Sequence, residues 1–318
     1  MNSSTPASSA STSSTPPPSS EPTPPTSSPP ASPVSPSLRP WHVYSTVAIL
    51  ALSVVATLLG FFRAGHYRDA AYHLPQIYGQ DVVTLGLGVP LLAVGLWFAM
   101  RGSLRGYVVW LGALGYMLYT WASYALMLYF NEFFLGYVAL FGLSLYAFVG
   151  GVLHLDPEAV RSRLDGRIPS RLTIAYLVGM GLFIPAGWLA EIIPAILDGT
   201  VPESVELAAV PTSVIYAMDL AVLLPAVIVV AVWLRQRRGW GYVFTGVLLV
   251  KFATLGLAVL AMEVRSAQTG VGGETGMMAV FAFITVATAV LGAKYLAALR
   301  TADVETPPAE AGTPRFSD

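Results

Sequence analysis

The chain has 318 residues, of which 55% are hydrophobic and only 11% are charged, and its formal net charge is −1. Soluble domains carry about 25% charged residues, so the composition excludes a soluble globular protein and predicts a multi-pass membrane protein. The sequence has no basic block of the kind that binds nucleic acid. It has no cysteine, which excludes disulfides, thiolate chemistry and cysteine-bound metals.

Residues 1–40 consist almost entirely of Ser, Thr, Pro and Ala, with Glu21 and Arg39 as their charged residues. Such a segment has too little apolar surface to offset the entropy lost on ordering, so we predict a disordered cytoplasmic tail. Residues 300–318 predict a second, short polar cytoplasmic tail. Between them, 41–299 predicts an all-α transmembrane domain.

Hydrophobic segments of spanning length recur along this domain. A helix needs about 20 mainly apolar residues to cross a bilayer. Eight segments satisfy this condition, and they lie at 42–62, 81–100, 106–130, 133–154, 172–197, 212–234, 240–262 and 275–298. The sequence therefore predicts a polytopic bundle of eight transmembrane helices.

The arginines between these segments predict their orientation. If each predicted span crosses the membrane, twelve arginines lie in segments on one side and three lie in segments on the other. Because cytoplasmic loops carry the excess of basic residues, we expect both termini in the cytoplasm and the protein in the cell (inner) membrane. The basic loop 161–171 fits this bias, and binding of anionic lipid head groups is the alternative interpretation.

The stretches 81–108 and 219–243 are similar to each other. Each begins with Asp, has Pro inside the span, and ends in Trp, a short arginine turn and Gly-Tyr-Val. The corresponding residues are Asp81, Pro90, Trp97 and Tyr107 in the first stretch and Asp219, Pro225, Trp233 and Tyr242 in the second. This pattern predicts a 4+4 parallel tandem repeat, in which helices interrupted at matching positions indicate a central binding site.

Three ionisable side chains in the predicted spans form the main candidate site. Lys251 lies near the centre of 240–262, whereas Asp219 and Glu191 lie about two turns from the outer ends of their spans. Charged groups inside a membrane are usually paired or functional, and a lysine side chain can extend toward the acids. We predict that Lys251 faces Asp219, Glu191 or both, either as a transport or substrate cluster or as a structural ion pair.

Segment 106–130 carries a second set of polar residues at helical spacing. These residues, together with an acid at the same level on the preceding span, are Tyr116, Tyr119, Thr120, Ser123, Tyr124 and Asp81. They predict either the lining of a polar cavity or hydrogen bonds between helices. In the loop that follows the first span, His66, Asp69 and His73 fall on one face if the loop is helical, which is a spacing that could hold a divalent metal ion.

The run "RGSLRG" followed by "WLGALGYMLYTWASYAL" resembles a recurrent pattern in uncharacterised multi-pass membrane proteins of prokaryotes. The resemblance covers the second to eighth spans and implies no activity, fold name or cofactor. Seven-span proteins with a retinal-binding lysine, aspartate-rich prenyl transferases and histidine-box desaturases do not fit the sequence.

Three functions remain open at this stage. The first is a small-solute or ion translocator that uses the Asp219, Lys251 and Glu191 cluster. The second is a membrane-embedded enzyme acting on a lipid or isoprenoid, with an acid as proton donor. The third is a structural or assembly partner in a membrane complex. We expect the lipid bilayer and an unknown small molecule, ion or lipid as partners, and no nucleic acid; a homo-oligomer and the cofactor stay open.

Overall fold

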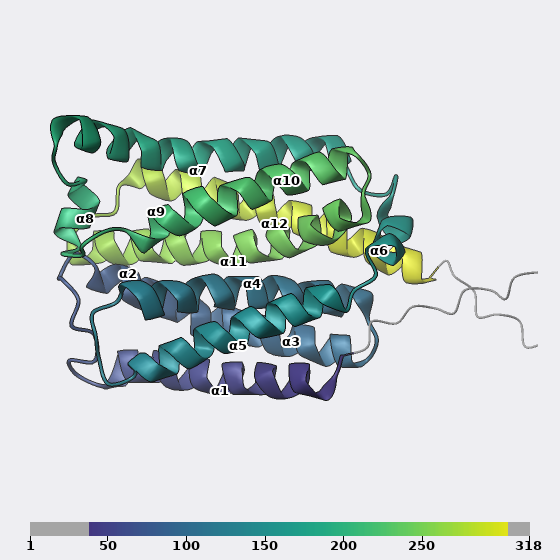
Figure 1. Cartoon of the computed structure of the whole chain (residues 1–318), viewed down its shortest axis with the longest axis horizontal. Coiled ribbons are helices and arrows are strands. Elements are labelled where there is room, and N and C mark those ends of the chain that lie inside the picture. The colour runs from purple at the N-terminus through teal and green to yellow at the C-terminus, as the bar shows by residue number, and fades with distance from the viewer. Residues whose placement is uncertain (1–37, 305–318) are drawn as a thin grey trace, which may run out of the picture. The chain divides into compact units, whose positions relative to one another are not determined.

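The computed structural model describes residues 38–304 (Figure 1). Within that range, helices joined by short turns form the whole architecture, without a strand. Twelve α-helices and two π-helical turns follow one another: α1 (Pro40–Phe62), α2 (Leu74–Val83), η1 (Thr84–Gly88), α3 (Val89–Met100), α4 (Leu104–Met127), α5 (Phe134–Leu153), α6 (Pro157–Leu164), α7 (Ser170–Asp198), α8 (Glu203–Leu207), α9 (Val214–Met218), η2 (Asp219–Leu223), α10 (Leu224–Arg235), α11 (Gly239–Thr269) and α12 (Thr275–Val304).

Local chemistry explains where several of these helices begin and end. The Ser103 hydroxyl accepts a hydrogen bond from the Gly106 amide at 3.2 Å and caps α4, because the first amides of a helix lack partners within it. α7 and α11 end at Gly199 and Gly270, whose φ values of +67° and +74° are left-handed. Glycine adopts this conformation without steric strain.

Seven helical segments are long and apolar enough to cross a membrane, which indicates an integral multi-pass membrane protein. Each of the eight predicted segments is mostly helical, but α4 does not reach the hydropathy of the other seven. Sixteen of the 24 residues of α4 are buried, among them Trp110, Tyr116 and Trp121. A helix surrounded by protein does not need an apolar surface toward lipid, so α4 carries tyrosine, tryptophan and threonine instead.

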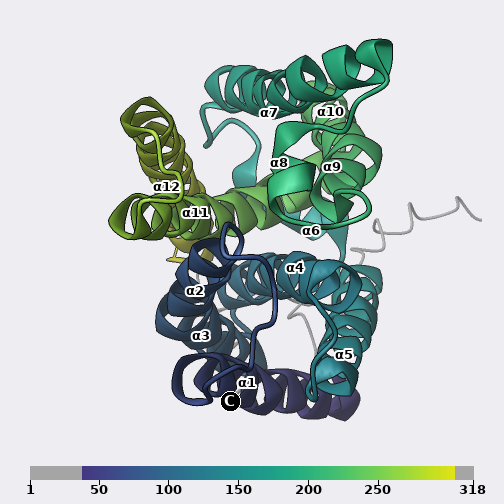
Figure 2. The same ribbon diagram turned by 90° about the vertical axis from the view of Figure 1, so that its left-hand side faces the viewer.

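α4 and α11 are the central helices, and they pack against each other (Figure 2). A Cβ atom added at Gly112 of α4 would lie 2.4 Å from Cβ of Val250 on α11. At Gly79 of α2, such an atom would lie 2.6 Å from the Met262 backbone, also on α11. The small residues therefore permit the close approach of helices that is common in membrane bundles.

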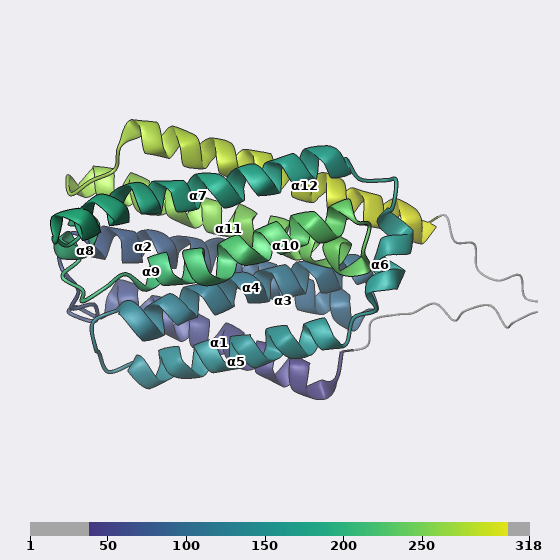
Figure 3. The same cartoon turned by 45° about the horizontal axis from the view of Figure 1, so that its top comes forward.

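Equivalent helices of the two halves pack in similar pairs. α3 lies against α4 and α4 against α5, and correspondingly α10 lies against α11 and α11 against α12. α10 also contacts α7 (Figure 3), as α3 contacts α1. The halves differ because α1 packs extensively on α5, whereas α7 reaches α12 through the Tyr176 hydroxyl, which donates to the Ile284 carbonyl at 3.1 Å. The tandem repeat therefore remains a prediction.

Both predicted proline positions follow a π turn. Pro90 and Pro225 are the second residues of α3 and α10, and Thr84 and Asp219, six residues before them, begin η1 and η2. A proline ring clashes with the carbonyl four residues earlier, and a wider π turn relieves such a clash. In this register Asp219 matches Thr84, which differs from the predicted match with Asp81.

The helix ends refine the predicted boundaries. The second span begins earlier than predicted, at Leu74, and α11 extends to Thr269. Pro40 already belongs to α1, and α12 continues to Val304 into the predicted C-terminal tail. The rest of the two predicted tails, 1–37 and 305–318, lies outside the described residues. α1 begins and α12 ends at the same end of the bundle (Figure 1).

Candidate functional site

Asp219 is the first residue of η2, and only 6% of it is exposed. Its carboxylate accepts two hydrogen bonds from neutral groups on other helices. The Tyr119 hydroxyl of α4 donates to Oδ1 at 2.8 Å, and the Trp188 indole of α7 donates to Oδ2 at 2.9 Å. Across the described residues, no lysine or arginine forms an ion pair with Asp219 within 4.0 Å. The direct contacts of the buried carboxylate are therefore hydrogen bonds from neutral groups.

Lys251, in α11, is also 6% exposed. Its ammonium nitrogen Nζ is buried and has no hydrogen-bond partner among the residues that the structure describes. Nζ lies 4.3 Å from the centroid of the Tyr119 ring and 4.9 Å from that of Phe252. Such distances are typical of cation–π contacts. Lys251 thus contacts two ring faces in place of a carboxylate.

Tyr119 connects the predicted partners Lys251 and Asp219. Its ring face contacts the Lys251 ammonium, and its hydroxyl donates to Asp219. The two charged groups therefore lie on either side of one phenol, without the direct ion pair that the sequence suggested as one alternative. Tyr119 was predicted as part of a polar face, but its role between the two charges depends on how α4 is rotated against α11.

Glu191 belongs to a neighbouring group of polar contacts. Its carboxylate accepts hydrogen bonds from the Ser204 amide at 2.9 Å and from the Tyr216 hydroxyl at 2.6 Å. The Ser204 amide lies in the first turn of α8, so Glu191 satisfies one of the free amides at that helix start. The Trp188 and Tyr216 rings lie 5.0 Å apart. Glu191 is thus connected to Asp219 through these two rings, without contact to Lys251.

Sequence reasoning missed Trp188 and Tyr216. Trp188 precedes Glu191 by three residues and therefore lies on the same face of α7. Tyr216 precedes Asp219 by three residues in the same way. This spacing is the signal that could have found them. An aromatic N–H or O–H that lies one helical turn from one intramembrane acid can donate a hydrogen bond to the acid on the neighbouring helix, as Trp188 does to Asp219 and Tyr216 does to Glu191.

A small pocket lies beside Asp219, between α7, η2, α10 and α11. Its volume is about 30 Å³, which is room for about two water molecules. Asp219 is its one ionisable lining residue, and apolar side chains such as Met180, Ile184, Val227 and Phe252 form its walls. Phe252 also contacts the Lys251 ammonium, so the pocket lies next to the lysine site.

The predicted hydroxyl face of α4 forms hydrogen bonds between helices. The Gln80 amide donates to the Tyr116 hydroxyl at 2.7 Å and to the Thr120 hydroxyl at 2.9 Å. The Thr84 hydroxyl lies 2.8 Å from that of Tyr116, and Ser123 donates to the backbone carbonyl of Thr120. These contacts join α2 and η1 to α4.

Asp81 is a second buried carboxylate, 1% exposed. It accepts hydrogen bonds from the Tyr67 hydroxyl at 2.6 Å and from the Tyr124 hydroxyl at 2.8 Å. Tyr67 lies in the loop between α1 and α2, where burial and the neighbouring Asp81 raise the pKa of its phenol well above the usual value. Tyr67 therefore stays protonated and continues to donate to Asp81.

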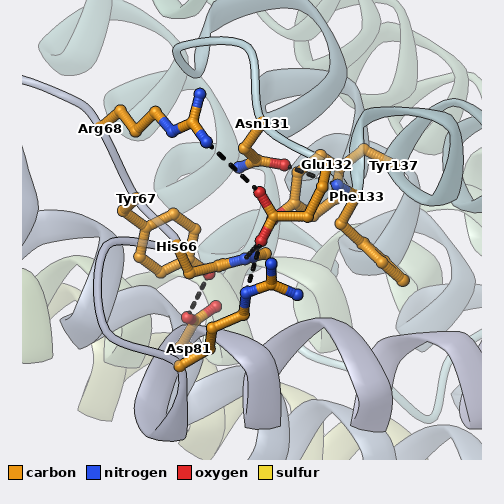
Figure 4. A network of polar contacts seen from close by, with 9 residues as sticks. His66, Tyr67, Arg68, Asp81, Asn131, Glu132, Phe133 and Tyr137 are labelled. Atoms are coloured by element: carbon orange, nitrogen blue, oxygen red, sulfur yellow. Dashed lines mark hydrogen bonds and ion pairs between the residues drawn. The ribbon is translucent and has the colours of Figure 1, made fainter.

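Charged loop residues meet above Asp81 (Figure 4). The Glu132 carboxylate lies 2.9 Å from Arg63 Nε, 3.7 Å from an Arg68 nitrogen and 3.1 Å from His66 Nδ1. The other ring nitrogen of His66 lies 3.0 Å from the Tyr137 hydroxyl. A backbone hydrogen bond, the contact with His66 and the Arg63 charge lower the pKa of Glu132 below its usual value of 4.5.

The three predicted metal ligands do not converge. His66 contacts Glu132 and Tyr137, whereas Asp69 lies 3.5 Å from His73 and accepts a hydrogen bond from the Tyr129 amide. The loop from Arg63 to Ala70 is not helical, so the assumed common face does not form. Among residues 38–304, no group of three histidine or carboxylate side chains is arranged to hold a metal ion.

Comparison with known proteins gives no relative from which a function could be transferred: no family model, no curated protein and no solved structure matches the chain.

Proposed function

We propose that the protein is a translocator for a proton or a small cation, with Asp219 as the acceptor and Lys251 as a tethered counter-charge. The observation that carries this proposal is the Lys251 ammonium, which is buried without a hydrogen-bond partner and separated from Asp219 by one tyrosine ring. The proposal includes eight crossings and cytoplasmic termini, as the arginine distribution predicts.

The cost of this arrangement supports a functional role. A buried polar group without a partner destabilises a protein by about 1–3 kcal/mol, and a charged group by more. A structural ion pair would reduce that cost through direct contact and further hydrogen bonds. Lys251 has neither, so its retention at this position is better explained by a step in which the ammonium moves or changes its partner.

A simple exchange follows from the geometry. When Asp219 binds a proton or a cation, its attraction for the Lys251 ammonium decreases. The ammonium is held by the Tyr119 and Phe252 ring faces alone, so it is free to move away without breaking a hydrogen bond. Glu191 and Tyr216 lie nearer the α8 end of the bundle and would provide the acidic access to Asp219 from outside.

Reconstituted vesicles test this proposal. We expect an imposed pH gradient or cation gradient to dissipate through the wild-type protein. The rate of dissipation should be at least ten-fold lower with the Asp219→Asn protein. Lys294→Met is the matched control, because Lys294 is the other lysine of the chain and its side chain is exposed. Equal rates for wild type, Asp219→Asn and empty vesicles would refute translocation of these ions.

The apolar pocket beside Asp219 favours one alternative, an enzyme that acts on a lipid or isoprenoid. In that case an acyl or prenyl chain would lie against Met180 and Ile184, and Asp219 would be the proton donor. Mass spectrometry of the purified protein separates the two functions. A lipid that co-purifies with wild type and is absent from Asp219→Asn would support the enzyme.

A further inference from the structure

We infer that the Asp219 site binds an organic ammonium ion, a compound with a protonated or methylated amine and a short apolar substituent. This inference rests on the proposed function and specifies its cargo. Three adjoining features carry it: the aromatic faces occupied by the Lys251 ammonium, a carboxylate without a direct ion pair, and an apolar pocket.

The Lys251 side chain itself shows where an ammonium binds. Its Nζ lies 4.3 Å from the Tyr119 ring centroid and 4.9 Å from that of Phe252. Faces of aromatic rings attract cations, and proteins recognise alkylated ammonium groups in this way. Because no hydrogen bond holds the lysine nitrogen, a ligand of the same chemistry would displace it by breaking cation–π contacts only.

Asp219 supplies the negative charge that such a ligand needs. Its two oxygens accept hydrogen bonds from Tyr119 and Trp188, which are neutral donors, and it makes no ion pair within 4.0 Å in the described part of the chain. Each carboxylate oxygen has a further lone pair for a ligand N–H. An ammonium on the Tyr119 face would therefore lie beside an available anion.

The pocket beside Asp219 suits the apolar part of the ligand. Phe252 belongs both to the pocket wall and to the ammonium contact, so a ligand with its nitrogen at the Lys251 position would direct its substituent into the pocket. The pocket has a volume of about 30 Å³, which is room for about two water molecules. This size limits the substituent to one or two carbon atoms.

A metal ion fits this site less well. Divalent ions require several oxygen ligands, whereas Asp219 is the one carboxylate lining the pocket and the surrounding walls are apolar. A proton would need Asp219 alone and would use neither the aromatic faces nor the pocket. An organic ammonium ion uses all three features.

Calorimetric binding of ethylammonium to purified protein in detergent tests the inference, with ethanol and sodium chloride as the neutral and inorganic controls. We expect Lys251→Met to bind ethylammonium at least ten-fold more tightly than wild type, because the competing internal cation is absent. Asp219→Asn should bind at least ten-fold more weakly. Tyr119→Phe keeps the ring face and should retain binding, whereas Tyr119→Leu should lose it.

The wild-type protein provides a measurement that does not depend on the folding of a variant. Its unfolding temperature should rise with ethylammonium more than with equal concentrations of ethanol or sodium chloride. If Asp219-dependent proton flux persists but ethylammonium neither binds nor stabilises, the inference fails and the proposed function stands. If binding follows the expected order but vesicles show no Asp219-dependent flux, the site is established and translocation fails.

Discussion

The Lys251 nitrogen gains cation–π attraction from two rings but lacks any hydrogen bond in the described structure. These contacts contribute about 0.5–2 kcal/mol, whereas leaving a buried polar group unpaired costs about 1–3 kcal/mol. We therefore expect Lys251→Met to be as stable as wild type or up to about 2 kcal/mol more stable. Thermal unfolding in detergent, with Lys294→Met as the control, measures the difference.

A double-mutant cycle shows how to interpret the opposite outcome, in which Lys251→Met is less stable than wild type. If Lys251→Met and Asp219→Asn each destabilise the protein and the double variant recovers most of the loss, the two residues form a structural ion pair. That result would favour a structural or assembly function over translocation.

Gly60 of α1 provides a second test, at the other buried carboxylate. A Cβ atom placed there would lie 2.7 Å from Asp81 Oδ2 and from the Tyr67 hydroxyl. Both atoms are fixed by their mutual hydrogen bond, so Gly60→Ala should destabilise the protein by about 1–3 kcal/mol. Gly179→Ala in α7 is the matched helical control. Nothing lies within 4 Å of its added Cβ, so it should be neutral or slightly stabilising; equal unfolding temperatures for the two variants would contradict the packing at Asp81.

Glu132 predicts a pH dependence of stability. Because its folded-state pKa is below the ordinary value of 4.5, the ionised carboxylate stabilises the folded state above that value. The contribution is lost as the pH falls through the lowered folded-state pKa. Glu132→Gln should therefore be less stable than wild type near pH 7, and the two unfolding temperatures should converge in strong acid. A difference that persists unchanged in acid would assign the effect to packing.

The sequence identifies the charged members of the candidate site but not how they are connected. Lys251 and Asp219 stand out because ionisable residues inside membrane spans are rare. The spacing of Trp188 from Glu191 marks the indole as a candidate donor, but the sequence does not show that it donates to Asp219 or that the Tyr119 phenol lies between the two charges. These contacts depend on the rotation of α4 and α7 about their axes, which an apolar helix surface does not reveal.

At the scale of the elements, the π turn η2 directs Asp219 toward its partners. Deleting Ala221 would shorten this turn toward an α turn and rotate α9 by about 100° relative to α10. Asp219 would then turn away from Tyr119 and Trp188. We expect Asp219-dependent flux in vesicles to fall to the level of Asp219→Asn.

Pro225→Ala is the appropriate control for this deletion. It removes the ring that the π turn accommodates but keeps the number of residues between Asp219 and α10, so the flux should be largely retained. Wild-type flux in the Ala221 deletion would mean that the position of Asp219 does not depend on η2.

The helical segments themselves follow from hydrophobicity, and the two prolines lie in the first turn after each π turn. The ends of α2 and α11 were less predictable, because polar residues such as Gln76 and Glu263 continue the helices beyond the apolar stretch. The repeat stays a prediction. Sequence matching pairs Asp219 with Asp81, whereas the π turns pair it with Thr84.

At the scale of the whole molecule, α4 decides how many times the chain crosses the membrane. Its hydropathy is too low for it to be counted with the seven apolar helices, yet it contacts α3, α5 and α11 over its length. A central helix is shielded from lipid by its neighbours, so composition alone underestimates its capacity to cross. With α4 as a crossing helix, the chain crosses eight times and both ends face the same side.

Single cysteines introduced around α4 distinguish eight crossings from seven, and the natural chain has no cysteine that would interfere. Phe130 and Arg101 are exposed residues beyond the two ends of α4, and Thr200 and Glu158 are exposed references in the other loops. In intact cells, a membrane-impermeant maleimide should label Phe130→Cys and Thr200→Cys. It should label Arg101→Cys and Glu158→Cys only after lysis, if the basic loops face the cytoplasm as the arginine distribution predicts. Labelling of Phe130→Cys and Arg101→Cys from the same side would mean that α4 does not cross, and an odd number of crossings would place the two ends of the chain on opposite sides.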